Sequence, residues 1–187
     1  MPRILVNLVA FQIGWLACVL GGAHGWPWLG VAVMALVAAL HLATTTRPGR
    51  EAVLLVFVAS LGALWDGLLV RLGFLEYPSG MILPWLAPVW IIAMWVGFAT
   101  TLNVSLGWLR GRWYWALGFG AIGGPLAYWA GMKLGGVQFP DPVAAIAVLA
   151  GGWSFLMPFV SWLALRLSGQ LVISPRTPLA AGGAGGR

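Results

Sequence analysis

The chain carries few charges, since only 7% of its 187 residues are Asp, Glu, Lys or Arg, against roughly a quarter in soluble domains. It has one cysteine, Cys18, and so cannot form an internal disulfide. Its His and Cys residues lack metal-ligand spacing, and it has no Gly-rich phosphate loop. We therefore expect no metal site, no cofactor and no nucleotide-binding domain.

Apolar residues make up 61% of the chain, and they recur in runs long enough to cross a bilayer. Backbone amides inside a bilayer must be bonded within the segment, and the alternation of barrel strands is absent, so we predict helices. The predicted fold is an all-α polytopic membrane protein with a transmembrane domain over residues 1–170 and a disordered cytoplasmic tail over 171–187. The six predicted spans are residues 4–21, 28–46, 52–73, 85–109, 113–134 and 143–167.

The net charge of +6 comes from basic residues in short loops between the apolar runs, which does not indicate nucleic-acid binding. Only Arg71 and Lys133 fall near one predicted side of the membrane. By the positive-inside rule, both termini are predicted to be cytoplasmic. The basic residues of the other side are Arg3, Arg47, Arg50, Arg110, Arg112, Arg166, Arg176 and Arg187. Because the loops 47–50 and 110–112 are short, we expect the second and third helices, and the fourth and fifth, to be antiparallel neighbours.

A short pattern of Leu-Gly, a spacer, a polar residue, an aromatic residue and Pro occurs at 20–27, 72–78 and 134–140. Gly and Pro there are ordinary helix-stop residues, so these segments are either three similar helix ends or the ends of three related hairpins. The second interpretation places His24, Glu76 and Gln138 in equivalent outer positions.

Asp66 lies deep in the third apolar run, where an acid costs several kcal/mol unless it is paired or hydrated. It shares a helix face with the small residue Gly62, which lets another helix approach. Arg71 lies about 140° round the helix, so Lys133 is at least as plausible a partner. Two interpretations stay open: a structural ion pair, and a ligand site in which Asp66 orients the cations. The outer polar residues of that predicted ligand site are Asp66, Arg71, Lys133, Glu76, His24 and Gln138.

A second polar group lies at the predicted cytoplasmic side and comprises Asn7, His41, Glu51 and Asn103. Such side chains commonly hydrogen-bond between helices, which predicts a structural polar network. The alternative is an acid–base pair of His41 and Glu51. In the fifth helix, Gly120, Gly124 and Pro125 predict either close packing with a kink or a broken helix that lines a cavity.

The chain resembles an uncharacterised bacterial inner-membrane family, domain of unknown function 2878. The resemblance lies in Tyr77-Pro-Ser-Gly80, Pro88-Val-Trp90, the segment 98–108 and the segment 123–131. Asn7, His41, Glu51 and Asp66 also fit the pattern of this family. The resemblance implies location in the inner membrane but no activity, and the family's association with genes of fatty-acid modification favours a lipid.

The leading hypothesis is a non-catalytic protein that binds or translocates a lipid or other amphipath at a polar site in the outer half of the bundle. One alternative is a membrane-embedded lipid-modifying enzyme with His41 and Glu51, or Asp66, as acid–base groups. Another is a scaffold that holds a soluble lipid-modifying enzyme at the membrane through its Arg-lined loops. Membrane lipids are the expected partners, and nucleic acid is not.

Overall fold

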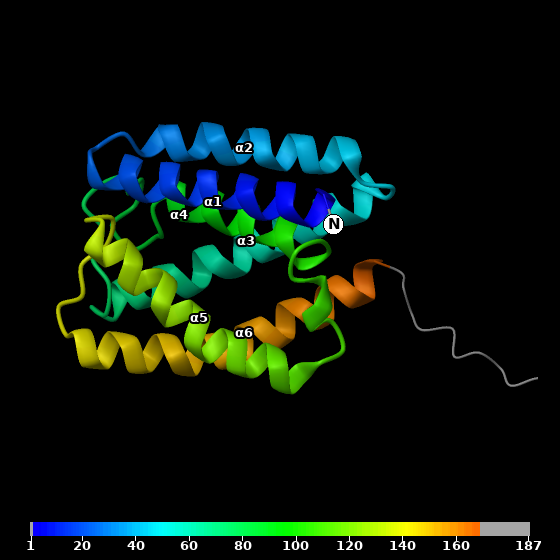
Figure 1. Cartoon of the computed structure of the whole chain (residues 1–187). Coiled ribbons are helices and arrows are strands. Elements are labelled where there is room, and N and C mark those ends of the chain that lie inside the picture. Colours follow the sequence, from blue (N-terminus) through cyan, green and yellow to red (C-terminus); the bar gives the residue numbers. More distant parts are fainter. Residues whose placement is uncertain (1, 169–187) are drawn as a thin grey trace, which may run out of the picture.

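The computed structural model describes residues 2–168, which form six α-helices and one short 3-10 helix (Figure 1). Within these residues β pairing is limited to one isolated bridge, so the prediction of an all-helical chain is confirmed. The predicted tail, residues 171–187, lies outside the described residues. The elements are α1 Pro2–Ala23, α2 Pro27–Thr44, α3 Pro48–Arg71, α4 Val89–Leu102, η1 Gly107–Leu109, α5 Trp113–Lys133 and α6 Pro142–Ser168.

Four helices, α1, α2, α3 and α6, are long and apolar enough to cross a membrane. The predicted span at 85–109 is wrong in extent, because α4 has 14 residues and is about 21 Å long, short of the roughly 30 Å of a bilayer core. Asn103 ends α4, and a turn and η1 follow. The fifth predicted span corresponds to α5, which is long enough but less apolar.

The helices run alternately in opposite directions, so the α2–α3 and α4–α5 connections lie at the same end as the start of α1 (Figure 1). Hydrogen bonds join segments at this end: Arg3 Nη2 donates to the carbonyl of Thr44, and Arg47 Nη1 donates to that of Ser168 at 2.6 Å. Basic side chains of the short connections therefore gather at one end of the bundle, as their alternation along the sequence predicts.

Each helix packs closely on its partner in the pairs α1–α2, α3–α4 and α5–α6. The expectation that α2 and α3, and α4 and α5, are close neighbours is wrong: α2 and α3 touch little, and α4 and α5 do not pack closely. Instead α4 fits against α1, α2 and α3. Glycines permit this approach, because a Cβ at Gly62 of α3 would overlap the Trp95 ring and one at Gly97 would overlap Met34 of α2.

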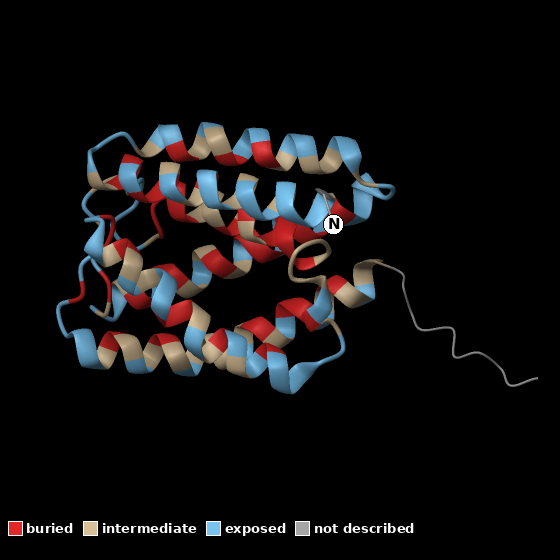
Figure 2. Ribbon diagram, in the orientation of Figure 1, coloured by how far each residue is buried: buried red, intermediate tan, exposed pale blue. Residues whose placement is uncertain are grey.

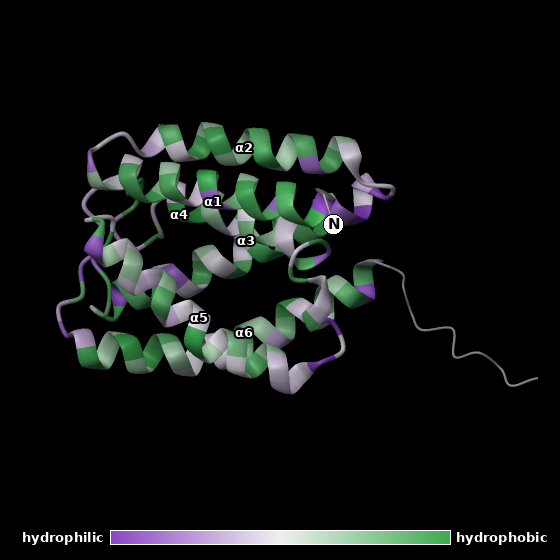
Figure 3. Cartoon of the chain, in the orientation of Figure 1, coloured by the Kyte–Doolittle hydropathy of each residue, from purple (hydrophilic) through white to green (hydrophobic). Residues whose placement is uncertain are grey.

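Large apolar side chains are exposed along the lengths of the helices. Val56, Leu64, Val143 and Phe155 are between 67% and 81% exposed. Figure 2 shows exposed positions along the outer faces of the helices, and Figure 3 shows that hydrophobic residues dominate the helices while hydrophilic ones cluster in the connections. The outer surface of the bundle therefore carries many large apolar side chains, which is unlike a soluble helical protein.

The three segments with the Leu-Gly pattern end their helices in the same way. Gly25, Gly73 and Gly135 have φ of 78°, 76° and 83°, and in each segment the following N–H bonds to the carbonyl five residues earlier. This left-handed cap favours glycine, and it defines the equivalent positions in the three segments. His24 precedes its cap glycine, whereas Glu76 and Gln138 follow theirs by three residues, so the predicted equivalence of His24 with the other two is wrong.

Glu76 and Gln138 are paired through their backbones. The N–H of Glu76 donates to the carbonyl of Gln138 at 3.0 Å, and the N–H of Gln138 donates to that of Glu76 at 2.7 Å. Leu75 and Val137 beside them are buried in a small apolar core with residues of α3 and α6. This antiparallel contact joins the end of the α3–α4 hairpin to the end of the α5–α6 hairpin.

Candidate functional site

Asp66 is fully buried near the last turns of α3 and accepts three hydrogen bonds. Its Oδ1 accepts from the hydroxyls of Tyr77 at 2.8 Å and Tyr128 at 2.7 Å, and its Oδ2 accepts from Trp95 Nε1 at 2.7 Å. These donors come from the α3–α4 connection, from α5 and from α4, so one carboxyl group links four parts of the chain. Removal from solvent and the nearby Asp66 carboxyl group raise the pKa of Tyr77 well above its ordinary value, which keeps this hydroxyl a donor.

The expected partners of Asp66, Lys133 and Arg71, are not the groups that bind it. Both cations are exposed at the ends of their helices, and the Lys133 ammonium lies over the Trp129 ring, 5.4 Å from its centroid. Within residues 2–168, the sole close contact between an acidic and a basic side chain is that of Glu51 with His41. Three neutral donors hydrogen-bond to Asp66 instead.

The other outer residues of the predicted ligand site do not converge on Asp66 either. Glu76 and Gln138 are exposed and meet through their backbones. His24 is also exposed, and its Nδ1 lies 2.8 Å from the carbonyl oxygen of Leu20 in the last turn of α1. The structure therefore places Asp66 apart from Arg71, Glu76, Lys133, Gln138 and His24.

A cavity of about 430 Å³ lies between α1, α4, α5 and the middle of α6. It exists because α5 packs on α6 and stands away from α4. A Cβ at Gly120 would overlap the backbone of Trp153, and one at Gly124 would overlap its ring, so these glycines bring α5 against α6. The helix is continuous through Pro125, which excludes the broken-helix interpretation for α5. The glycine-rich face nevertheless forms one wall of the cavity.

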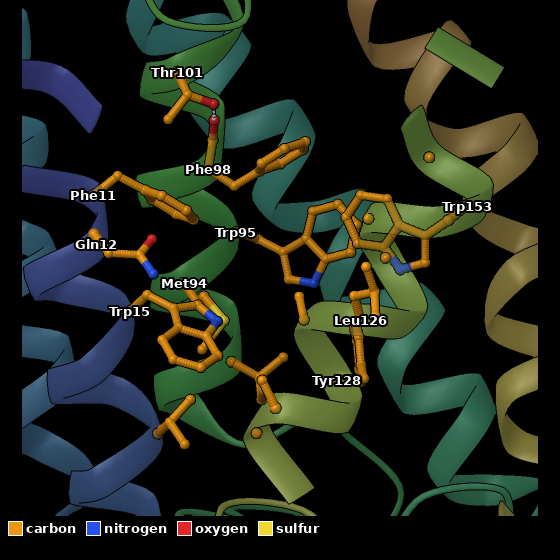
Figure 4. A pocket seen from close by; sticks show the side chains of 18 of the residues that line it. Phe11, Gln12, Trp15, Met94, Trp95, Phe98, Thr101, Leu126, Tyr128 and Trp153 are labelled. Atoms are coloured by element: carbon orange, nitrogen blue, oxygen red, sulfur yellow. Dashed lines mark hydrogen bonds between the residues drawn. The ribbon is translucent and has the colours of Figure 1, made fainter. Parts of the chain in front are cut away.

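The cavity wall is aromatic and uncharged. Neither an acidic nor a basic residue is among its described lining residues. Figure 4 shows Phe11 and Trp15 of α1 on one side and Trp95, Phe98 and Trp153 on the other. The aromatic lining residues are Phe11, Trp15, Tyr77, Trp90, Trp95, Phe98, Phe119, Tyr128 and Trp153.

Few polar groups reach the cavity, and most of them are already bonded. Thr101 Oγ1 donates to the carbonyl of Phe98, and Ser105 Oγ donates to Asn7 Oδ1 at 2.8 Å. The Gln12 amide extends from α1 beside Phe11 and Trp15 (Figure 4), and the described residues supply no hydrogen-bond partner for it. Gln12, and the buried Trp153 indole N–H, which also has no partner among the described residues, are therefore the polar groups best placed to meet a molecule in the cavity.

The polar network at the opposite end links α2, α3 and α4. His41 Nε2 lies 3.1 Å from Glu51 Oε2, and Asn103 Nδ2 donates to Glu51 Oε1 at 2.8 Å. Arg110 Nη1 in turn donates to Asn103 Oδ1 at 3.0 Å. Both oxygens of Glu51, which is 7% exposed, are thus occupied. This chain of contacts holds the turn after α4 against α3.

Asn7 forms a separate contact between α1 and α4. Its Nδ2 donates to the carbonyl of Thr100 at 3.3 Å, and its Oδ1 accepts from Ser105 Oγ. The structure thus brings His41, Glu51 and Asn103 together in one group and places Asn7 in a neighbouring one. Their side chains satisfy one another, as expected of polar residues between apolar helices.

Sequence reasoning missed the three donors of Asp66 and the cavity that they line. Tyr77, Trp95 and Tyr128 all lie within or near apolar runs, where an aromatic residue is most simply interpreted as core. No spacing connects them, because they belong to three different segments. Gln12 carried a usable signal, since an amide in the middle of an apolar span needs a partner.

These features define an all-helical protein with four helices of membrane-crossing length, a buried carboxyl group and an aromatic cavity. The chain belongs to the family described as a protein of unknown function (DUF2878), whose model matches residues 4–159. No curated protein and no solved structure matches it.

Proposed function

We propose that the protein is a multi-pass inner-membrane protein that binds an amphipathic small molecule, such as a single-chain lipid, in the cavity between α1, α4 and α5. The observation that carries this proposal is an aromatic, uncharged cavity of about 430 Å³ in a bundle whose outer surface is apolar. Small-molecule sites in proteins measure roughly 300–1,000 Å³, so this space is large enough for a single-chain amphipath or part of one.

The membrane assignment rests on the four long apolar helices and on the exposed apolar side chains along them. We further propose that α4 and α5 lie within the bilayer as well, which makes six membrane segments with both ends in the cytoplasm. The gathering of Arg side chains at the end that holds the start of α1 supports this orientation. The short α4 is compatible with a position inside the bilayer, because non-helical backbone is tolerated there when protein covers it. Asn7 and Asn103 form such contacts at the turn after α4.

Cysteine labelling tests the orientation. Cys18 is buried and would be replaced by Ala, after which Gly49→Cys and Gln138→Cys each place one exposed thiol at an opposite end of the bundle. A membrane-impermeant thiol reagent should label Gln138→Cys in intact spheroplasts and Gly49→Cys only after lysis. The reverse pattern, or equal labelling, would contradict both ends being cytoplasmic.

The bound amphipath is tested with a substitution that fills the cavity. Gly123 lines the cavity, and a Cβ there would make only ordinary contacts, the closest at 3.6 Å to the Phe119 ring. Gly118 lies on the same helix with no atom within 4 Å of its Cβ position, and it does not line the cavity. Native mass spectrometry should show a retained molecule in the unaltered protein and in Gly118→Phe, and should show its loss in Gly123→Phe. Retention in Gly123→Phe, or no retained molecule at all, would overturn the proposal.

A membrane-embedded lipid-modifying enzyme is the second candidate function. The hydrogen bond between His41 and Glu51 favours it, since the two side chains are poised for proton exchange. It requires that His41→Ala abolish a change in cellular lipid composition while the protein level stays the same. The engagement of both Glu51 oxygens within the protein favours the binding function instead.

A further inference from the structure

Neutral groups alone donate to the Asp66 carboxyl group. An indole N–H can only donate, and the two phenolic hydroxyls donate as well, so its two oxygens receive three donors. Three donors suit an ionised carboxyl group, whereas full burial without a counter-ion opposes its ionisation. No Lys, Arg or His forms an ion pair with Asp66 within residues 2–168. The carboxyl group therefore has the donors of a carboxylate but lacks the protein counter-ion that would stabilise a charge there.

The same three donors form part of the cavity wall. Trp95, Tyr77 and Tyr128 each present one edge to Asp66 and also line the cavity. In Figure 4, Trp95 and Tyr128 lie at the cavity on the side away from Gln12. Asp66 itself does not line the cavity, so a single layer of aromatic side chains separates its carboxyl group from the space. A cation in that space would supply the missing counter-charge and would favour ionisation of Asp66.

The aromatic lining of the cavity also favours a cation. The face of an aromatic ring carries negative potential and attracts cations, most strongly for Trp and when water is excluded. Donation of an N–H or O–H to a carboxylate polarises the ring further toward negative charge at its face. An anionic head group would meet this potential without any basic side chain in the wall, because none lines the cavity.

We propose that the amphipath of this cavity is a cation, with a quaternary or protonated amine as its polar group. Aromatic faces would hold the cationic group, Asp66 would supply the compensating charge from behind Trp95, Tyr77 and Tyr128, and the Gln12 carbonyl oxygen would accept any N–H. This inference rests on the proposed function, because it specifies the ligand of the same cavity. It differs from the expectation that Asp66 orients Arg71 and Lys133 toward an anionic head group.

Two probes of equal size and opposite charge test this proposal on the unaltered protein. Tetraphenylphosphonium and tetraphenylborate share their shape, and triphenylphosphine oxide is a neutral relative. Binding is measured by titration calorimetry in detergent, and specific binding is the part that Gly123→Phe loses and Gly118→Phe keeps. We expect tetraphenylphosphonium to bind at least about tenfold more tightly than tetraphenylborate. Equal or inverted affinities would overturn the proposal.

Asp66→Asn should lower the affinity for tetraphenylphosphonium about tenfold and leave that for triphenylphosphine oxide unchanged. Glu51→Gln is the matched control, because it removes a buried acid in the polar network at the opposite end. It should change neither affinity. An Asp66→Asn protein that still prefers the cation would overturn the role of this carboxylate, and if this variant does not fold, the comparison of probes on the unaltered protein decides.

The outcomes separate this inference from the function on which it rests. Specific binding of the neutral probe without preference for the cation would leave the cavity a binding site and refute the cationic ligand. Absence of any specific binding, together with absence of a retained molecule in native mass spectrometry, would refute the proposed function itself.

Discussion

Gly62→Ala is expected to destabilise the protein through the contact that holds Trp95 against Asp66. A Cβ at Gly62 would overlap Cγ and Cδ2 of the Trp95 ring. This ring has little freedom to move, because its Nε1 donates to Asp66 Oδ2 at 2.7 Å and its face stacks on Trp153 with ring centroids 5.0 Å apart. The substitution must therefore strain the packing or break the hydrogen bond.

The magnitude follows from three contributions. Overpacking a well-filled interior costs about 1–3 kcal/mol. Displacing Trp95 far enough to lose its bond to the carboxylate adds about 1.5–3 kcal/mol. Ala in place of Gly inside a helix returns about 1 kcal/mol. The net loss is about 1.5–5 kcal/mol, which for a chain of this size lowers Tm by roughly 3 °C or more.

Thermal unfolding in detergent, followed by circular dichroism, measures this effect. Gly151→Ala is the matched control, because Gly151 lies inside α6, is exposed, and has no atom within 4 Å of its Cβ position. It should leave Tm unchanged or raise it slightly. If Gly62→Ala unfolds at the same temperature as Gly151→Ala, the close contact between α3 and the Trp95 ring is refuted.

Three further predictions concern other parts of the fold. Leu75→Ala should lower the free energy of unfolding by about 2–5 kcal/mol, because the Leu75 side chain is fully buried. The control is Glu76→Ala, which should change the free energy of unfolding by less than about 0.5 kcal/mol, because Glu76 is exposed and bonds through its backbone. Tyr128→Phe should lower the free energy of unfolding by about 1.5–3 kcal/mol. In an Asp66→Asn background this loss should be smaller, because both substitutions remove the same interaction. Asn103→Ala should speed tryptic cleavage after Arg110 and Arg112, since it releases the α4–α5 connection from Glu51, and equal cleavage rates would contradict that role of Asn103.

The distribution of apolar residues was sufficient to predict an all-helical chain and most helix bounds. The third and sixth predicted helices, 52–73 and 143–167, agree with α3 and α6 within a few residues at each end. The fourth was predicted too long, because Asn103 and Ser105 lie in an otherwise apolar run. Their side chains bond to Glu51 and Asn7 on other helices, and such partners decide where a helix ends without leaving a periodic signal.

The candidate site was only partly predictable. The isolation of Asp66 in an apolar run correctly indicated a buried side chain on a small-residue face. Its assignment to Lys133 or Arg71 assumed that a buried acid needs a cation. Three neutral donors from separate segments satisfy it instead, and their convergence depends on how α4 and α5 are placed around α3.

The helical class, the apolar outer surface, the alternation of basic connections and the family all follow from the amino-acid sequence, because composition and short motifs express them directly. The groups that surround Asp66 and the position of the cavity depend on how the helices pack. Glycines at positions 62 and 97 bring α4 against α3 and α2, and glycines at 120 and 124 bring α5 against α6. The space that these contacts leave beside α4 becomes the aromatic cavity, and the buried acid that first drew attention to α3 lies directly behind its wall.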